Sequence, residues 1–382
     1  MEQLNQRLQK YIDLVSVLTG KNTVMDRIVP LMKYLGNPER KLKVVHVAGT
    51  SGKTSTCYYI ASLLKEDGIK CGLTVSPHID SITERIQINL KPLDEDIFIK
   101  ELNIFIDLIE KTNITPSYFE LLYAFAIWYF AKIGIEYAVV ETGMGGLYDA
   151  TNVITNENKI CVITDIGLDH TNILGNTLKE IAYQKAGIIH HHNHLIMYKQ
   201  SDEIMSVIND RVSKEHASYE FLIQNNILLE NEPKKYINKL PLFQQRNFLL
   251  AYYTVIYLIR REVIKDPSVN GIKRALEVKI PARMDVLELQ GKTIIMDGAH
   301  NPQKIHNLVE SYIDKYPGLP TTIVISFKDS KDYKESIDEL LKISDGIIIT
   351  KFSTTKELPS RAIEPKDIAK YLESKHFKNF II

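Results

Sequence analysis

The stretch Lys43-Val-Val-His-Val-Ala-Gly-Thr-Ser-Gly-Lys-Thr-Ser55 decides the fold of this chain. It begins as an apolar, β-branched run that predicts a buried strand, and it ends where a helical pattern starts. Between the two, Gly49 and Gly52 let the backbone come close to a polyphosphate, and the helix N-terminus offers unpaired N–H groups. Lys53 would neutralise phosphate charge, and Thr54 could bind magnesium. The stretch therefore predicts a strand, a loop and a helix that together hold a nucleotide.

The loop differs from the common Walker A pattern G-x-x-x-x-G-K-[ST]. Val47 occupies the place of the first glycine, so this loop is shorter. A tight strand-to-helix turn without a nucleotide is the alternative interpretation. The order of strand, Gly-x-x-Gly, lysine and hydroxyl favours a nucleotide, although the loop alone indicates no particular reaction. We expect the nucleotide to be bound here by Gly49, Thr50, Ser51, Gly52, Lys53, Thr54 and Ser55.

Outward from the loop, β-rich runs alternate with helical patterns. Strands are expected at Val44–Ala48, Lys70–Val75, Tyr137–Glu141, Ile160–Asp165 and Leu195–Tyr198. Helices are expected at Lys53–Asp67, Asp94–Lys111, Ser117–Lys132, Leu178–Ala186 and Gln244–Arg261. This alternation predicts an α/β fold with a doubly wound, mostly parallel sheet. A second alternation after Asp266-Pro267 predicts a smaller C-terminal α/β domain, so we expect domains at 1–266 and 267–382.

The composition is that of an ordinary globular protein, with 45% hydrophobic residues and 47 basic residues balanced by 47 acidic ones. This balance gives no sign of nucleic acid or membrane-surface binding. Cys57, Cys71 and Cys161 have no C-x-x-C spacing, which argues against a disulfide framework or a zinc site. The apolar stretch Leu121–Ile135 is shorter than the roughly 20 residues of a membrane helix. Because Met1–Lys10 is polar, we expect no secretory signal and a cytoplasmic location.

Motif-like segments flank the loop along most of the chain. They include Met25-Asp-Arg27, Leu35-Gly36-Asn-Pro38, Ser76-Pro77-His78, Glu84-Arg85-Ile86, Glu141-Thr-Gly-Met-Gly-Gly146, Asp149-Ala-Thr-Asn152, Ile166-Gly-Leu-Asp-His170, Lys185-Ala-Gly187, Gln244-x-x-Asn247, Arg283, Asp297-Gly-Ala-His300 and Ser360-Arg361-Ala362. The short loop resembles the turn of the Mur ligase superfamily. The flanking segments are similar to its folylpolyglutamate/dihydrofolate synthase branch.

The resemblance implies an ATP-dependent ligase that adds L-glutamate to a pteroate or folate carboxylate. A carboxylate is a poor acylating agent, so ATP would first convert it into an acyl phosphate, which the amine then attacks. The enzyme would mainly position ions and substrates in such a phosphoryl transfer. ATP and Mg²⁺ are therefore the expected cofactors, and a monomer is expected.

A magnesium site is implied by residues that end strands or follow them. By the resemblance, Thr54, Ser76, Glu141 and His170 would hold the ion, and Lys185 would be carbamylated to become an anionic ligand. Oxygen donors suit magnesium, whereas imidazole is softer than magnesium prefers. From pattern alone, His170 would be structural and Lys185 a surface lysine. The resemblance favours the functional interpretation.

Other roles also come from the resemblance. Asn247 would contact adenine, Arg283 the phosphates and Asp297 the ribose, while Lys53, Lys185 and His300 are the candidate catalytic residues. The candidate substrate-binding residues are Phe119, Glu120, Leu147 and Asp149. Phe119 could stack on a flat heterocycle or belong to the core.

Three departures from the branch leave alternatives open. Ser51 and Thr54 replace the usual Asn and Gly of the loop, so the magnesium hydroxyl could be Thr54 or Ser55. Leu147 follows the paired glycines where the branch has Arg, and Phe243 replaces a His. A ligase of the same superfamily that joins a different acid and amine is therefore a second hypothesis. A nucleotide-binding protein without catalytic activity is a third.

Overall fold

The computed structural model describes residues 2–12, 23–222, 233–262, 267–329, 332–354 and 360–382. Contacts divide the chain into two units. The first contains Met1–Ile237 and Arg246–Ile280, and the second contains Asn238–Gln245 and Pro281–Ile382. Each unit has its own hydrophobic core, and each is described by itself below.

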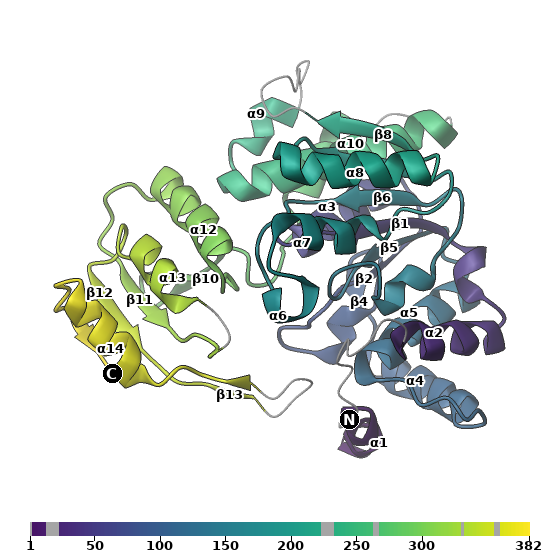
Figure 1. Cartoon of the computed structure of the whole chain (residues 1–382), viewed down its shortest axis with the longest axis horizontal. Helices are drawn as coiled ribbons and strands as arrows, with labels where there is room; N and C mark the ends of the chain where they lie inside the picture. Colours follow the sequence, from purple (N-terminus) through teal and green to yellow (C-terminus); the bar gives the residue numbers. More distant parts are fainter. Residues whose placement is uncertain (1, 13–22, 223–232, 263–266, 330–331, 355–359) are drawn as a thin grey trace. The chain divides into compact units, whose positions relative to one another are not determined.

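In the first unit, the described strands form one eight-stranded sheet with the order β4-β3-β2-β5-β1-β6-β7-β8 (Figure 1). The strands are β1 (Lys43–Ala48), β2 (Cys71–Thr74), β3 (Gln87–Ile88), β4 (Lys91–Pro92), β5 (Tyr137–Glu141), β6 (Ile160–Ile163), β7 (His194–Tyr198) and β8 (Ser218–Leu222). In the order β2-β5-β1-β6-β7-β8 the described neighbours are parallel, whereas β3 pairs antiparallel with both β2 and β4 at one edge. The central strands β2, β5, β1, β6 and β7 are buried, which explains why they are mostly apolar runs.

The helices of the first unit precede the first strand, lie between the strands along the chain, or follow β8. They are α1 (Glu2–Ile12), α2 (Thr23–Tyr34), α3 (Lys53–Glu66), α4 (Glu95–Ile109), α5 (Tyr118–Lys132), α6 (Thr171–Leu174), α7 (Leu178–Ala186), α8 (Asp202–Lys214), α9 (Pro233–Ile237), α10 (Leu242–Glu262), whose first residues cluster with the second unit, and α11 (Val269–Leu276). Short 3-10 helices occur at Pro38–Lys41, Ile82–Arg85 and Ala150–Val153.

The helices form layers over the sheet. Helix α3 packs on β1, β2 and β5, and α11 packs on α3. A separate core cluster joins α4 and α5 to residues such as Val44 and Val140, and another joins α7 and α8 to β6 and β7. Strand β1 lies at the centre, where the chain order of the strands reverses on its two sides. In open α/β sheets, ligands bind beyond the carboxyl ends of the strands at such a position.

The second unit is a smaller α/β unit. It contains β9 (Asp285–Leu289), β10 (Lys292–Met296), α12 (Pro302–Lys315), β11 (Thr322–Ile325), α13 (Tyr333–Leu340), β12 (Gly346–Ile349), β13 (Ser353–Thr354), β14 (Ser360–Arg361), α14 (Pro365–Ser374) and β15 (Phe380–Ile381). The strands β11, β12 and β15 form a parallel sheet, whereas β9 and β10 form an antiparallel hairpin. Buried Ile305, Ile337, Ile347 and Ile368 join its helices to this parallel sheet.

The predicted fold class, a doubly wound sheet followed by a smaller α/β domain, is confirmed. The expected boundary at residue 266 lies outside the described residues. Contacts divide the chain later, between Ile280 and Pro281, because α11 packs on α3 and Arg274 forms an ion pair with Glu66 of that helix. No helix in the described part of the chain is long and apolar enough to cross a membrane.

Candidate active site

The phosphate loop closes against the carboxyl end of β6. The backbone N–H groups of Thr50 and Ser51 donate to the carbonyl oxygen of Asp165, at 2.8 and 3.3 Å. A Cβ atom on Gly49 would lie 1.7 Å from the Thr164 hydroxyl, so only glycine fits there. The Thr50 hydroxyl also donates to the carbonyl of Gly167, at 3.0 Å. The loop is therefore held by β6 as well as by β1.

Two lysines converge on one carbonyl of this loop. The Nζ atoms of Lys53 and Lys185 donate to the Gly49 carbonyl oxygen, at 3.1 and 2.9 Å. Lys185 is on α7, and only 3% of it is exposed. The charge of Lys53 at the start of α3 suits a polyphosphate, and Lys185 of α7 reaches the same carbonyl from the other element. The structure thus places Lys185 in the interior beside the loop and not on the surface.

Glu141 ends β5 next to the loop and is buried. Its Oε1 accepts a hydrogen bond from the Thr54 hydroxyl at 2.8 Å, and its Oε2 accepts one from the Ser76 backbone N–H at 3.1 Å. One carboxylate and one hydroxyl are hard oxygen donors, and magnesium often uses one or two carboxylates together with phosphate oxygens. These residues therefore fit a magnesium ion.

His170, the expected histidine ligand of magnesium, begins helix α6. It is the N-cap residue of α6 with a φ of 50°, and 42% of its side chain is exposed. Its Nε2 lies 3.9 Å from a carboxylate oxygen of Asp169. Among the described residues, no three His, Cys, Asp or Glu side chains gather in a way that could hold a metal ion. The structure therefore brings Thr54, Ser76 and Glu141 together, but it does not bring His170 into a metal-binding cluster with acidic residues.

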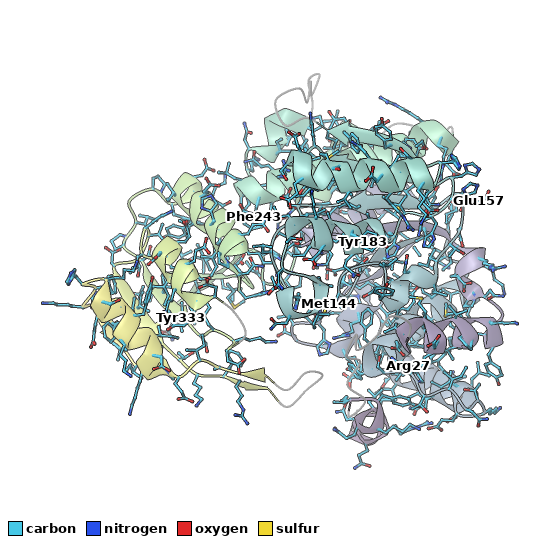
Figure 2. The ribbon with its side chains drawn as sticks, in the orientation of Figure 1. Arg27, Met144, Glu157, Tyr183, Phe243 and Tyr333 are labelled. Atoms are coloured by element: carbon cyan, nitrogen blue, oxygen red, sulfur yellow. The ribbon has the colours of Figure 1, made fainter. Side chains whose placement is uncertain are left out.

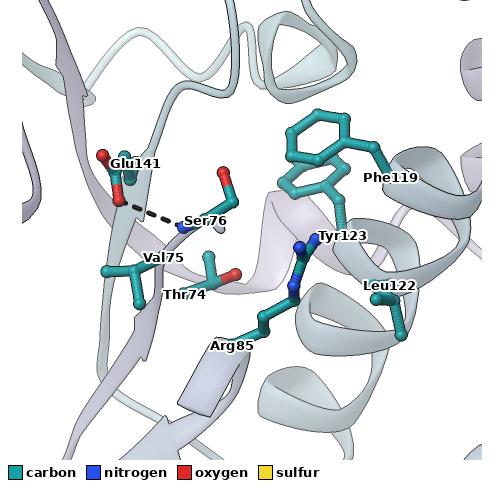
Figure 3. Close-up of a pocket in the computed structure, with 8 residues that line it drawn as sticks. All are labelled: Thr74, Val75, Ser76, Arg85, Phe119, Leu122, Tyr123 and Glu141. Carbon is teal, nitrogen blue, oxygen red and sulfur yellow. Dashed lines mark hydrogen bonds between the residues drawn. The ribbon is translucent and has the colours of Figure 1, made fainter. Parts of the chain in front are cut away.

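A pocket opens beside Glu141 and Ser76 (Figure 3). Its wall on α5 includes the rings of Phe119 and Tyr123, which are nearly parallel with centroids 6.5 Å apart. The guanidinium group of the buried Arg85 points toward this wall in Figure 3. The remaining lining residues are Thr74, Val75 and Leu122. The pocket therefore offers an aromatic surface and a cation, with the proposed metal ligand Glu141 at its edge.

Of the other expected substrate residues, Glu120 does not line this pocket. Its carboxylate accepts hydrogen bonds from Arg27, labelled in Figure 2, at 2.6 and 2.9 Å. The same carboxylate accepts the Ser117 backbone N–H in a capping box that begins α5. These contacts indicate a structural use of Glu120.

Leu147 and Asp149 also lie outside the residues that line the pocket. The Leu147 N–H donates to the Gln184 carbonyl at the end of α7, at 2.7 Å. The buried Asp149 carboxylate accepts from the Met144 N–H at 2.8 Å and from the Thr151 hydroxyl at 2.6 Å. Burial raises the pKa of Asp149, and these hydrogen bonds oppose the increase. Asp149 thereby fixes the glycine-rich turn that follows Glu141.

The expected adenine residue, Asn247, lies on α10 against the loop. Its side-chain oxygen is 2.3 Å from the place where a Cβ of Gly52 would be, and Gly52 has a φ of +89°. In the second unit, Arg283 Nη1 donates to the Ala282 carbonyl and is 2.9 Å from the Cβ position of Gly298.

Asp297 and His300 lie in the turn that follows β10. The Asp297 carboxylate accepts the N–H groups of Met284 and Ala299, and burial raises its pKa. His300 Nδ1 is 2.8 Å from the Gly298 carbonyl. Arg283, Asp297 and His300 therefore belong to one turn region of the second unit.

Comparison with known proteins adds to this geometry. A family model described as the Mur ligase middle domain matches residues 47–236, and one described as the dihydrofolate synthetase C-terminal domain matches residues 282–379. The dihydrofolate synthetase of Saccharomyces cerevisiae is 31% identical over 377 residues, which cover 94% of this chain and 88% of the yeast protein. The chain belongs to the dihydrofolate synthase/folylpolyglutamate synthase family.

Two further members of this synthase family support the assignment. The dihydrofolate synthase/folylpolyglutamate synthase of Bacillus subtilis is 30% identical over 399 residues, which cover 95% of this chain and 92% of that protein. The structure of Escherichia coli FolC in complex with DHPP and ADP matches with a TM-score of 0.80 and 25% identity, covering 99% of this chain and 88% of that one. This synthase is therefore an ATP-dependent ligase.

Several residues around the synthase site were not predicted from the sequence. Arg85 lines the pocket, and Asp165 and Arg246 form an ion pair beside the loop. Arg85 lies in the quoted segment Glu84-Arg85-Ile86, and Arg246 lies within Gln244-x-x-Asn247. The available signal was an arginine inside each of these segments. The partner of Arg246 was not available, because Asp165 is 81 positions away in the sequence.

Proposed function

We propose that this synthase joins L-glutamate to the carboxylate of a pteroate or a folate, with conversion of ATP to ADP and phosphate. The observation that carries this proposal is the pocket with the Phe119–Tyr123 wall and Arg85, which reaches Glu141 beside the phosphate loop. A flat heterocycle would stack on the aromatic wall. The names of the yeast and B. subtilis relatives support the same substrates.

The reaction requires two steps. An oxygen of the pteroate or folate carboxylate attacks the γ-phosphorus of ATP, which forms an acyl phosphate and releases ADP. The glutamate amine then attacks the acyl carbon, phosphate leaves, and the amine loses a proton. Lys53 would hold the phosphate oxygens and stabilise their charge, and the loop N–H groups would orient them. The chain's residues thus position and stabilise charge instead of forming covalent bonds.

Magnesium fits this site through Glu141 and Thr54, with Ser76 next to them. When bound, the ion would neutralise phosphate charge. Glu141 would keep the Thr54 hydroxyl oriented toward the phosphates. His170 remains a proposed ligand on the strength of the resemblance alone.

Carbamylation of Lys185 is a further part of the proposal. A carbamate keeps one N–H on Nζ, which is enough to preserve the hydrogen bond to the Gly49 carbonyl. The added carboxylate would be a hard anionic ligand next to the loop. Incubation with ¹³C-bicarbonate should produce a carbamate signal in the NMR spectrum of the wild type and none in Lys185→Ala. An unmodified amine in the wild type at neutral pH would contradict this part.

The remaining expected roles stay proposals: Asn247 for adenine, Arg283 for phosphate, Asp297 for ribose and His300 near the reacting groups. We also propose a cytoplasmic monomer. The free and buried state of Cys57, Cys71 and Cys161 supports a reducing compartment. Light scattering of the purified chain would test the monomer.

The decisive experiment measures phosphate release from ATP with glutamate and either dihydropteroate or tetrahydrofolate. Mass spectrometry of the products identifies the amide. Product with either acid supports the proposal, and product only with other acid and amine pairs favours a different ligase of the superfamily. Absence of turnover with all pairs, while ADP still binds, would favour a nucleotide-binding protein without catalytic activity. A Phe119→Ala variant should raise the KM for the acid about tenfold and leave the KM for ATP unchanged.

A further inference from the structure

We propose that Asp165 and Arg246 are positioning residues that hold the phosphate loop in its nucleotide-binding form and so set the affinity for ATP. Neither residue touches the reacting groups in this inference. This inference rests on the proposed function in one respect: the ligand of the loop is a nucleoside phosphate.

The pair has a strongly constrained geometry. Arg246 Nε donates to both carboxylate oxygens of Asp165, at 2.9 and 3.1 Å, and Nη2 donates to Oδ1 at 2.7 Å. The guanidinium lies 3.8 Å from the centroid of the Tyr198 ring, and the Tyr198 hydroxyl donates to the Arg246 carbonyl at 3.2 Å. A planar guanidinium group that makes several hydrogen bonds and stacks on a ring is fixed in orientation as well as in position.

Both members of the pair are connected to the phosphate loop. Asp165 is connected through its own backbone carbonyl, and Arg246 is connected through the residue that follows it. The Asp165 carbonyl accepts the N–H groups of Thr50 and Ser51. Asn247, the next residue after Arg246, places its side-chain oxygen against Gly52. The ion pair therefore ties the end of β6, which holds one side of the loop, to the part of α10 that covers the other.

Stability alone does not account for this arginine. Its Nη1 is buried and has no hydrogen-bond partner in the part of the chain that the structure describes. A buried donor without an acceptor costs free energy, and an ion pair whose two side chains are each 23% exposed returns only part of that cost through screened attraction. The directional hydrogen bonds of the pair fix the position of Asp165, and so of the loop, which apolar residues could not do.

The test compares Asp165→Asn, Arg246→Gln and the double variant. Calorimetric titration with ADP measures the Kd, and steady-state kinetics measure the KM for ATP and for the acid. We expect each single variant to raise the Kd for ADP and the KM for ATP about tenfold, with the double variant no worse than either one. The KM for the acid should change less than about twofold, because the pocket beside Glu141 is untouched. Arg246→Lys keeps the charge but loses the paired hydrogen bonds of the guanidinium group, so it should raise the Kd for ADP by an intermediate factor. This variant replaces Arg246→Gln in the test if Arg246→Gln fails to fold.

Arg7→Gln is the matched control. Arg7 forms a similar multiple contact with Asp107, at 2.7 Å, and with Asn103, at 2.8 Å, but it lies on α1. This variant should lower stability without changing the Kd for ADP. An unchanged Kd in both single variants, additive effects in the double variant, or an equal increase in Arg7→Gln would overturn the inference. Because ADP binding needs no acid, the result holds even if no pteroate or folate is a substrate.

Discussion

Thr54 and Ser55 are neighbouring hydroxyl residues with different surroundings. The Thr54 hydroxyl donates to Glu141, whereas the Ser55 hydroxyl is buried and has no partner among the described residues. The sequence left open which of them would be the magnesium hydroxyl. The contact with Glu141 favours Thr54, since a carboxylate and a hydroxyl in contact can share one ion.

Replacing these two residues separately tests the assignment. Thr54→Val keeps the shape but loses the hydroxyl, so kcat should fall about a hundredfold and the magnesium concentration for half-maximal activity should rise. Ser55→Ala is the matched control, and it should change kcat less than about threefold because the hydroxyl has no bond to lose. Magnesium titrations of ATP turnover measure both. The opposite order of effects would assign the ion to Ser55.

At the scale of one element, the start of α5 uses the carboxylate of Glu120 in two structural contacts. Its carboxylate completes the capping box with Ser117 and also pairs with Arg27 of α2. Glu120→Gln keeps the size but weakens the ion pair, so the free energy of unfolding should fall by about 2 kcal/mol. Urea unfolding measures this loss.

The kinetic counterpart separates this structural role from substrate binding. Glu120→Gln should change the KM for the acid less than about twofold. Asp107→Asn removes an exposed carboxylate from an ion pair with Arg7 and should cost less than about 1 kcal/mol. A large increase in KM with unchanged stability would show that Glu120 binds the substrate after all.

His194 in strand β7 and His190 in the turn before it have neutral side chains in the folded protein at neutral pH. Burial, assisted by the charge of Arg261, lowers the pKa of His194 to about 4, and burial lowers that of His190 to about 3. In the unfolded chain both values are about 6.5, so the unfolded state binds more protons below that pH. Their contribution to stability is therefore fully present above about pH 6.5 and is lost as the pH falls toward 4 for His194 and toward 3 for His190.

His194→Phe isolates one of these groups. The new ring can still stack on Tyr257, whose ring centroid lies 3.6 Å from that of His194, although the contact with Ser218 is lost. The variant should lose less stability than the wild type between pH 7 and about pH 5, as measured by urea midpoints at each pH. An equally steep loss in His194→Phe would contradict the assignment.

For the whole molecule, the participation of the second unit in nucleotide binding is the main expectation left to test. Arg283→Gln removes a cation from the region of Asp297 and His300. If Arg283 holds phosphate, the KM for ATP should rise about tenfold while the KM for the acid stays constant. Lys375→Gln, an exposed residue of the same unit paired with Asp338, is the control and should change neither value. An unchanged KM for ATP in Arg283→Gln would remove Arg283 from the nucleotide site.

The limits of sequence reasoning follow from the range of each interaction. The loop and strands such as Tyr137–Glu141 could be predicted because glycines and apolar runs act locally. The same local reasoning gave no helix at Asp202–Lys214 and no pair between Asp165 and Arg246. Glu120 was expected in the substrate site from the resemblance of the Phe119-Glu120 pair. The pocket is lined by Phe119 and not by Glu120, because a helix places neighbouring side chains on different faces. Which face of the helix lines the pocket depends on tertiary packing. A single sequence does not state explicitly how the helix packs.

The central place of β1 also has a consequence for synthesis on the ribosome. Lys43 pairs with Tyr137, so β1 is made roughly 90 residues before its first partner strand. At the usual rate of translation this is a delay of about 5–20 s, during which an apolar strand has both edges unpaired. A nascent chain that stops before Asp165 also lacks the carbonyl on which Thr50 and Ser51 close. ATP binding by ribosome-bound fragments would therefore mark the moment at which β6 has joined the sheet.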